Sequence, residues 1–254
     1  MPASLRPLII LAGMIVVWQA VVTLTGVQPF ILPPPLSVAE ALTKRFDLIL
    51  PHALTTLSEI VLGLLLGLGL GVSTALTMAF FRPARRWLMP VMVVSQAIPV
   101  FAIAPLLVLW LGYGLPSKVA MAGMIIYFPV TATFFDGLRR TDRGWLDLAQ
   151  AMDGSRWAVL RHIRIPAALP ALASGVRVAA AVAPIGAVVG EWVGSRGGLG
   201  YLMLHANARM QVDLMFAALI VLAAIAVALF FAADAAMRRL IPWQPDVLPA
   251  DERN

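Results

Sequence analysis

The chain has 254 residues, of which 61% are apolar and only 13% are charged, and its formal net charge is +6. A soluble domain is closer to half apolar and a quarter charged, so this composition excludes an ordinary soluble protein and indicates a membrane protein. The absence of cysteine from the sequence excludes disulfide frameworks, thiolate metal sites, iron–sulfur clusters and cysteine nucleophiles.

The first apolar stretch, residues 7–24, is expected to be a retained membrane span and not a cleaved signal peptide. Its apolar run is longer than the usual core of a signal peptide, and no small-x-small cleavage pattern follows it. A proline-rich connection then leads to an amphipathic segment, residues 38–50, which we expect at the membrane interface. Ser37 is the expected N-cap of this segment, with Glu40 completing a capping box.

A second span is expected over residues 57–80, which are rich in leucine and glycine. Four glycines give it the small-xxx-small spacing that lets two helix backbones approach closely: Gly63, Gly67, Gly69 and Gly71. Glu59, near the outer end of this span, is expected to lie at the membrane interface. The second span is therefore a candidate for tight packing against a neighbouring helix.

The third span is expected over residues 87–110 and the fourth over residues 119–135. Both contain prolines: Pro90, Pro99, Pro105 and Pro129. Proline frees backbone carbonyls, which lipid cannot satisfy, so this many breaks favour a water-lined pathway. Ser95, Gln96 and Pro99 place a polar pair beside a break and are the expected pathway lining. Hydrogen bonding between helices is the alternative role for the polar pair.

The chain becomes polar over residues 136–164, although apolar side chains still recur there at three- and four-residue intervals. That spacing predicts a loop built as two short helices. A fifth span is expected over residues 169–192, and a glycine-rich external turn follows at 194–200. A sixth span is expected over residues 214–236, and the polar tail, residues 242–254, is expected to be disordered.

Six spans place both termini on the same side of the membrane. In that arrangement 13 of the 19 basic residues lie on the terminal side, five lie opposite, Lys118 among them, and Arg177 lies inside the fifth span. By the positive-inside rule, the termini and the 136–164 loop face the cytoplasm. The arginines are scattered over several short loops and tails, so the charge indicates topology and not a nucleic-acid partner.

The sequence contains little that could perform chemistry. Its two lysines, Lys44 and Lys118, are not in a Gly-Lys-Ser/Thr context, which excludes a phosphate-binding P-loop. The three histidines, His52, His162 and His205, are expected in separate loops, which argues against a metal site or an activated serine nucleophile. We therefore expect neither an enzyme nor a bound cofactor or metal in this chain.

Residues 147–166 resemble the cytoplasmic signature of ABC-importer permeases, which reads Glu-Ala-Ala, three residues, Gly, nine residues, Ile, one residue, Leu-Pro. The alignment is anchored on Ile163, Ile165 and Pro166, and it places the triplet on Asp147, Leu148 and Ala149 and the glycine on Asp153, next to Gly154. The chain departs from the signature in having Asp for Glu, Leu for the first Ala and Asp153 for the glycine. An ordinary solvated basic loop is the alternative interpretation.

The resemblance implies an all-α membrane protein with six transmembrane helices, similar to type I ABC-importer permeases, and a single transmembrane domain over residues 1–254. Residues 136–166 would form its cytoplasmic coupling loop, seated in a cleft of an ATPase subunit. The implied partners are two copies of that ATPase, a periplasmic or lipid-anchored substrate-binding protein and a second copy of the chain. ATP and magnesium would be used by the ATPase. The location would be the bacterial inner membrane, with both termini cytoplasmic.

Further resemblance covers roughly residues 30–240 and points to the permeases for sulfonates, taurine, nitrate and pyrimidine precursors. The segments that carry it are residues 32–37, 95–110 and 175–191. Within that branch, residues 95–113 and the fifth span look most like permeases for the pyrimidine precursor of thiamine. The alternative from another class is an ion-coupled secondary transporter, which would need ionisable residues clustered at mid-membrane, where Arg177 is the only candidate.

Arg177 and Glu191 are ionisable residues inside the fifth span and are candidates for the translocation pathway, because an unpaired charge in lipid costs several kcal/mol. They are fourteen residues, or about 21 Å, apart along the helix and cannot pair with each other. Arg177 could reach Asp234 or a water-filled path. Glu191 could meet Arg196, Arg209 or a docked binding protein. A structural ion pair is an equally open role for both.

Overall fold

The computed structural model describes residues 6–243, apart from the side chains of residues 7 and 8. Within that range the secondary structure is helical. Its elements are α1 (Arg6–Thr25), α2 (Pro35–Lys44), α3 (Phe46–Phe80), α4 (Arg82–Ala97), α5 (Val100–Leu111), α6 (Leu115–Arg139), α7 (Arg143–Ala151), α8 (Arg156–Val159), the π-turn η1 (Leu160–Arg164), α9 (Ile165–Gly194), α10 (Leu199–Ala208) and α11 (Val212–Leu240).

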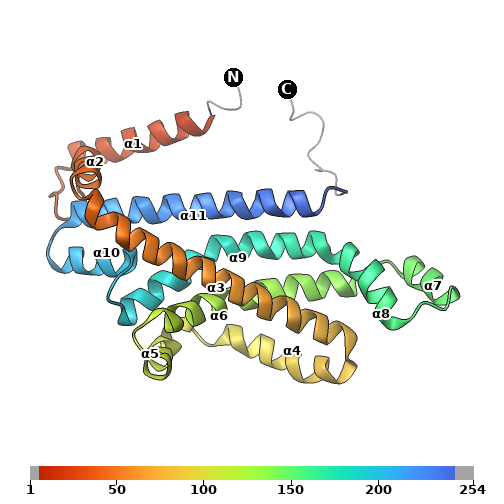
Figure 1. Ribbon diagram of the computed structural model, residues 1–254. Coiled ribbons are helices and arrows are strands. Elements are labelled where there is room, and N and C mark those ends of the chain that lie inside the picture. Colours follow the sequence, from red (N-terminus) through yellow and green to blue (C-terminus); the bar gives the residue numbers. More distant parts are fainter. Residues whose placement is uncertain (1–5, 244–254) are drawn as a thin grey trace.

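The long helices run between two ends of an elongated molecule (Figure 1). One end carries α7 and α8 and is called the loop end below; the other carries α2, α5 and α10 and is called the turn end. Helices α3, α6 and α11 run toward the loop end, and α9 runs back toward the turn end. Each of these long helices therefore connects the two ends.

Among the described residues, four helical segments are long and apolar enough to cross a membrane. They are α3, α6, α11 and the continuous stretch Arg156–Gly194. The pair α4 and α5 makes a fifth if its two halves count as one span, and the apolar part of α1, Ile9–Thr25, is shorter. The structure confirms an all-helical membrane protein over residues 6–243, with four to five candidate spans where six were expected.

The third expected span is not one straight helix. It consists of α4 and α5, which are bent by 102° at Ile98 and Pro99. Ile98 is extended (φ −91°, ψ 118°), because the proline ring disfavours a helical conformation in the residue before it. Pro90 and Pro105 also lie in this pair but remain inside their helices, so only Pro99 produces the break.

The start of the amphipathic segment differs from the sequence prediction. Helix α2 begins at Pro35, where a fixed φ suits the first helical position, and its N-cap is Pro34. Ser37 lies in the first turn and donates a hydrogen bond from Oγ to the Pro34 carbonyl at 2.8 Å, so it is not the N-cap. The segment then breaks at Arg45, and α3 runs without interruption from Phe46 to Phe80.

Helix α6 packs between α3 and α9 and forms the centre of the buried core. Three of the four glycines singled out in the sequence lie in the contact between α3 and α6: Gly63, Gly67 and Gly71. A Cβ atom at Gly63 would collide with the Cβ of Ala122, whereas one at Gly69 would meet nothing within 4 Å. The small-residue contact is thus confirmed for the three glycines spaced four residues, about one helical turn, apart, and Gly69 lies outside it.

Large apolar side chains are exposed along α1, α4 and α5. Leu24 is 86% exposed, Trp87 is 80% exposed and Leu109 is 77% exposed. A soluble protein rarely presents so much contiguous apolar surface. These faces suit lipid or another apolar protein surface, which agrees with the composition.

Candidate functional site

The loop between α6 and α9 is held in shape by a tight turn after α7. The Asp142 side chain caps α7 by accepting a hydrogen bond from the Gly144 N–H at 2.7 Å. At the other end, the Gly154 N–H donates to the Ala149 carbonyl at 2.9 Å. A Cβ at position 154 would lie 2.8 Å from that carbonyl oxygen, so the turn requires glycine there. Asp153 has φ +52°, the left-handed conformation that glycine adopts most easily.

The second half of the loop is continuous with a long helix. Ser155 caps α8 by accepting from the Ala158 N–H at 3.2 Å. The π-turn η1 then joins α8 to α9, and the whole stretch Arg156–Gly194 contains 39 residues. The half-buried residues Ile163, Ile165 and Pro166 lie at this junction. The two short helices expected over residues 136–164 are therefore present, and the second is the start of a spanning helix.

The loop presents an apolar surface at the loop end. Trp145, Leu148 and Met152 are 56%, 62% and 74% exposed, and Asp147 beside them is also exposed. The three apolar side chains, but not Asp147, line a cavity of about 550 Å³ together with Ile163 and other residues. Exposed aromatic and apolar side chains around a hollow are typical of a protein-binding surface.

Glu191 is buried at the turn end and holds together the turn between α9 and α10. It is 1% exposed and accepts hydrogen bonds from the Thr56 hydroxyl at 2.6 Å, from the Gly200 N–H and from the Tyr201 N–H at 3.3 Å. The Thr56 oxygen in turn accepts from the Leu199 N–H at 2.7 Å. A carboxylate thus satisfies the first free N–H groups of α10, as the helix dipole favours.

The prediction that Glu191 meets Arg196 or Arg209 is therefore wrong. Helix α10 turns its N-terminus back onto the last turns of α9, and its N–H groups bind the carboxylate instead. Two other predictions fail nearby. Glu59, expected at the interface, is 2% exposed, and Lys118, expected in an outer loop, is 1% exposed inside α6. Sequence position alone could not reveal that these helix ends are covered by protein.

Lys118 and Glu59 complete the buried cluster. Lys118 Nζ donates hydrogen bonds to the carbonyls of Tyr113 and Gly194, so it joins the end of α9 to the start of α6. Glu59 faces Glu191, and its Oε2 has no hydrogen-bond partner among the described residues. A lysine and two glutamates from three different helices are thus buried together, and the positive charge of Lys118 offsets part of the cost of burying the two carboxyl groups, which repel each other when both are charged.

The histidines lie in helices and not in loops. His52 Nδ1 accepts a hydrogen bond from the Gly198 N–H at 3.0 Å, and its ring stacks on Tyr201, which in turn contacts His205. His162 lies in η1 at the other end of the molecule. Among the described residues, no group of three metal-ligating side chains comes together.

Arg177 pairs with the last spanning helix. Its Nε donates to Asp234 Oδ1 at 2.6 Å, and Arg238 Nε donates to Asp234 Oδ2 at 2.9 Å. Of the two options left open by the sequence, the structure contains the pair with Asp234. Arg177 and Glu191 thus have separate partners in the same chain, at different levels of α9.

Ser95, Gln96 and Pro99 lie together at the break between α4 and α5. Ser95 Oγ donates to the Met92 carbonyl of its own helix at 2.7 Å, while Gln96 and Pro99 are exposed. Polar groups on an exposed face of a spanning helix need water or another protein beside them. Their role as pathway lining stays a prediction.

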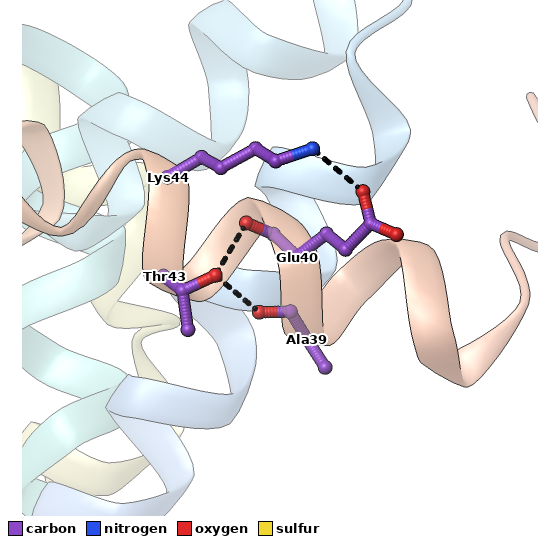
Figure 2. A network of polar contacts seen from close by, with 4 residues as sticks. All are labelled: Ala39, Glu40, Thr43 and Lys44. Atoms are coloured by element: carbon purple, nitrogen blue, oxygen red, sulfur yellow. Dashed lines mark hydrogen bonds and ion pairs between the residues drawn. The ribbon is translucent and has the colours of Figure 1, made fainter.

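The short helix α2 carries an exposed ion pair at the turn end. Figure 2 shows Lys44 Nζ donating to Glu40 Oε2 at 2.8 Å, while the Thr43 hydroxyl donates to the carbonyls of Ala39 and Glu40. The hydrogen bond from Lys44 lowers the pKa of Glu40 below its ordinary value. Glu40 therefore pairs along the helix and does not form the expected capping box.

Comparison with known proteins connects these features to a family. A family model described as "Binding-protein-dependent transport system inner membrane component" matches residues 63–244. A "Probable ABC transporter permease protein" of Haemophilus influenzae is 55% identical over 237 residues, which cover 93% of this chain and 97% of the relative.

Two further relatives carry substrate names. The "Formylaminopyrimidine transport permease protein ThiX" of Halalkalibacterium halodurans is 33% identical over 95% of this chain and 96% of its own length. The "Riboflavin transport system permease protein RibX" of Chloroflexus aurantiacus is 39% identical over 91% of this chain and 87% of its own length.

The fold also matches a solved structure, titled as an inward-facing conformation of the MetNI methionine ABC transporter. The TM-score is 0.66 at 17% sequence identity, and the match covers 78% of this chain and 98% of the solved one. At this identity the likeness shows the fold alone.

Proposed function

The chain belongs to the binding-protein-dependent transport inner-membrane permeases, and from this membership we propose that two copies of it carry a small solute into the cell. ATP hydrolysis in a separate subunit, with its magnesium, would drive the transport, and a periplasmic or lipid-anchored binding protein would deliver the solute. The permease is a transporter and not an enzyme. Membership of an ATP-driven family decides against the ion-coupled secondary transporter.

One observation carries the proposed coupling role of the loop. The α7–α8 turn is fixed by the Gly154–Ala149 hydrogen bond, presents exposed apolar side chains, and continues through η1 into α9 without a flexible loop. A rigid apolar projection of this kind fits a groove on a partner protein. Movement of the groove would then displace a spanning helix as a rigid body. The signature residues Asp147, Leu148, Ala149, Asp153, Gly154, Ile163, Ile165 and Pro166 all belong to this unit.

The proposed topology has six crossings: α1, α3, the α4–α5 pair, α6, α9 and α11. It needs α1 to span the membrane and the bent pair to count as one crossing. Both termini and the loop then lie in the cytoplasm, where 13 of the 19 basic residues of the sequence gather, as the positive-inside rule requires. The distribution of basic residues along the chain and the alternation of helix directions support the same orientation (Figure 1).

We assign the translocation pathway to the face around Ser95, Gln96 and Pro99, between two copies of the chain. Its polar groups beside a helix break suit a water-filled path better than lipid. Arg177 and Glu191 were candidates for the same pathway, and both bind neighbours within the chain. Their contribution is proposed to be the rigidity of α9 during alternating access.

The proposed substrate is a pyrimidine precursor of thiamine. The resemblance of residues 95–113 and the relative named for formylaminopyrimidine transport support it. The relative named for riboflavin transport is more similar in sequence, so a second nitrogen heteroaromatic belongs in any test. Alkanesulfonates, taurine and nitrate are the alternative substrates.

The coupling role is tested by affinity copurification of the ATPase subunit from the same organism. Leu148→Arg changes an exposed side chain of the loop, and Gly154→Asp breaks its turn. Both variants should enter the membrane normally and lose the ATPase. Arg143→Gln, an exposed change at the start of α7, is the matched control and should retain it. Unchanged copurification with Leu148→Arg and Gly154→Asp would refute the assignment.

The substrate is tested by uptake into vesicles that contain the complete transporter. Labelled aminopyrimidine uptake should require ATP and should be displaced by unlabelled aminopyrimidine. Stronger displacement by riboflavin, taurine or nitrate would reassign the substrate while leaving the coupling role in place.

A further inference from the structure

A basic cavity of about 750 Å³ lies on the other side of the coupling loop. Arg82 at the start of α4, Arg156 in α8 and Arg164 in η1 contribute to its lining, together with Gln150 of α7 and Phe80 at the end of α3. Within the part of the chain that the structure describes, no aspartate or glutamate lines it. Three arginine side chains thus line one cavity in which no carboxylate of the described residues compensates their positive charge.

Arg164 is the residue of this cavity with an unsatisfied hydrogen-bond donor. Its Nε is buried and has no hydrogen-bond partner among the described residues. A buried donor without an acceptor is costly, and a charged donor more so. Over residues 6–243, neither Arg82, Arg156 nor Arg164 forms an ion pair with a carboxylate. An anion in the cavity would supply the missing acceptor and would also reduce the repulsion between the guanidinium groups.

The surroundings of the cavity are apolar and aromatic. Phe81, which also lines it, is 55% exposed, and Trp157 is 58% exposed and packs edge-on against Phe80 at 6.1 Å between ring centroids. The cavity lies where α3 ends and α4 begins, at the boundary of a spanning helix. Aromatic side chains beside basic ones at such a boundary are typical of contact with lipid headgroups.

We propose that this cavity binds the phosphate of an anionic phospholipid, with Arg82, Arg156 and Arg164 around the headgroup. Phe81 and Trp157 would lie along the upper part of the acyl chains. The lipid would join the start of α4 to α8 and so tie the coupling loop to the membrane surface. Only the assignment to the cytoplasmic leaflet rests on the proposed function.

The ATPase is a poorer fit for this cavity. The apolar cavity around Trp145 and Leu148 shares only Gly154 and Val159 with the basic one, so the two hollows lie on different sides of the loop. The apolar side suits a protein groove. The basic side opens beside the α3–α4 turn, at the end of a spanning helix, where lipid headgroups are the nearest abundant anions.

The test is native mass spectrometry of the full-length chain, purified in detergent, delipidated and titrated with phosphatidylglycerol. Phosphatidylglycerol should bind the wild-type chain more tightly than phosphatidylcholine, and excess inorganic phosphate should not displace it. Arg164→Gln and Arg156→Gln should each weaken binding by about tenfold, as expected for the loss of one charge-assisted hydrogen bond. Arg85→Gln, an exposed change in α4 outside the lining, is the matched control and should change binding less than twofold.

Three results would overturn the proposal. Equal binding of phosphatidylglycerol by the wild-type chain, Arg164→Gln and Arg156→Gln would place the lipid elsewhere. Displacement by inorganic phosphate would assign the cavity to a free anion. Release of the lipid on addition of the ATPase subunit would assign the cavity to the protein interface. Because the lipid titration itself is measured before any ATPase is added and without transport substrate, its failure would leave the proposed transport function untouched.

Discussion

Replacing Glu191 with alanine should release the turn that joins α9 to α10. In the wild-type chain this carboxylate accepts hydrogen bonds from Thr56, Gly200 and Tyr201. Alanine removes this acceptor from the Gly200 and Tyr201 N–H groups in a site where Glu191 is 1% exposed, whereas the Thr56 hydroxyl retains the His52 carbonyl at 3.2 Å. The substitution also removes a negative neighbour of buried Lys118.

The decrease in the free energy of unfolding can be estimated from these contacts. A hydrogen bond to a charged group contributes about 1.5–3 kcal/mol, so three give an upper range of about 4.5–9 kcal/mol. The contributions are not additive, and an opened turn lets water reach the donors, so we expect a loss of about 3–5 kcal/mol, as for breaking other buried charged contacts. Glu191→Gln keeps one acceptor oxygen and should lose only about 1–2 kcal/mol.

The assay combines thermal unfolding in detergent with trypsin cleavage after Arg196, an exposed residue in the turn. If the turn opens locally, cleavage of Glu191→Ala should accelerate by about a hundredfold to a few thousandfold, because each 1.4 kcal/mol corresponds to a factor of ten in the open population. Glu40→Gln, which changes an exposed carboxylate, should behave like the wild type. If Glu191→Ala is cleaved at the wild-type rate and has the wild-type midpoint of thermal unfolding, the assigned role of this carboxylate is refuted.

Three further predictions concern single positions. Gly63→Ala should lower the free energy of unfolding by about 1–3 kcal/mol in the same thermal unfolding assay, because the added methyl group collides with α6. Gly69→Ala should be neutral or stabilising, because nothing lies near that position. Equal effects of the two substitutions would refute the glycine contact. Asp153→Gly should stabilise the loop by about 1 kcal/mol, because φ at this position is +52°, a conformation that glycine adopts more easily than aspartate. The measurement is amide hydrogen exchange in the loop, and faster exchange in the variant would contradict the prediction. Lys44→Met should raise the pKa of Glu40 toward its ordinary value in an NMR titration, because Lys44 lowers that pKa in the wild type. The Glu40–Lys44 ion pair of the wild type is lost only as the pH falls through this lowered pKa. An unchanged pKa in Lys44→Met would exclude the ion pair.

The parts of the fold that depend on local spacing could be predicted from the sequence. The two short helices of the loop follow from apolar side chains at three- and four-residue intervals. The close approach of α3 to another helix follows from glycines four residues apart, such as Gly63 and Gly67. These patterns are local, and the residues that create them are also the residues that make the contacts.

The break in the third span was harder to predict. Pro90, Pro105 and Pro129 remain inside helices, whereas Pro99 breaks one. Whether a proline interrupts a helix depends on whether neighbouring groups satisfy the carbonyl that it frees, and that depends on tertiary packing.

The buried cluster at the turn end could not be assembled from the sequence because its members come from three helices. Thr56, Lys118 and Glu191 are separated by more than sixty residues each but meet at one turn. The available signal was the presence of ionisable side chains inside apolar stretches. That signal marks Lys118 and Glu59 as unusual without saying which groups they meet.

The uninterrupted stretch from Arg156 to Gly194 has a mechanical consequence. Its 39 residues form a lever of about 58 Å that begins in the loop and ends at the turn held by Glu191. A displacement of the coupling loop meets no hinge loop along that length, although the π-turn at residues 160–164 and the prolines Pro170 and Pro184 interrupt the regular hydrogen bonding of the helix. The far end of the lever is clamped to α3 and α10 through Thr56 and Gly200. If the proposed coupling role holds, force applied at the loop end would be delivered to hydrogen bonds at the turn end.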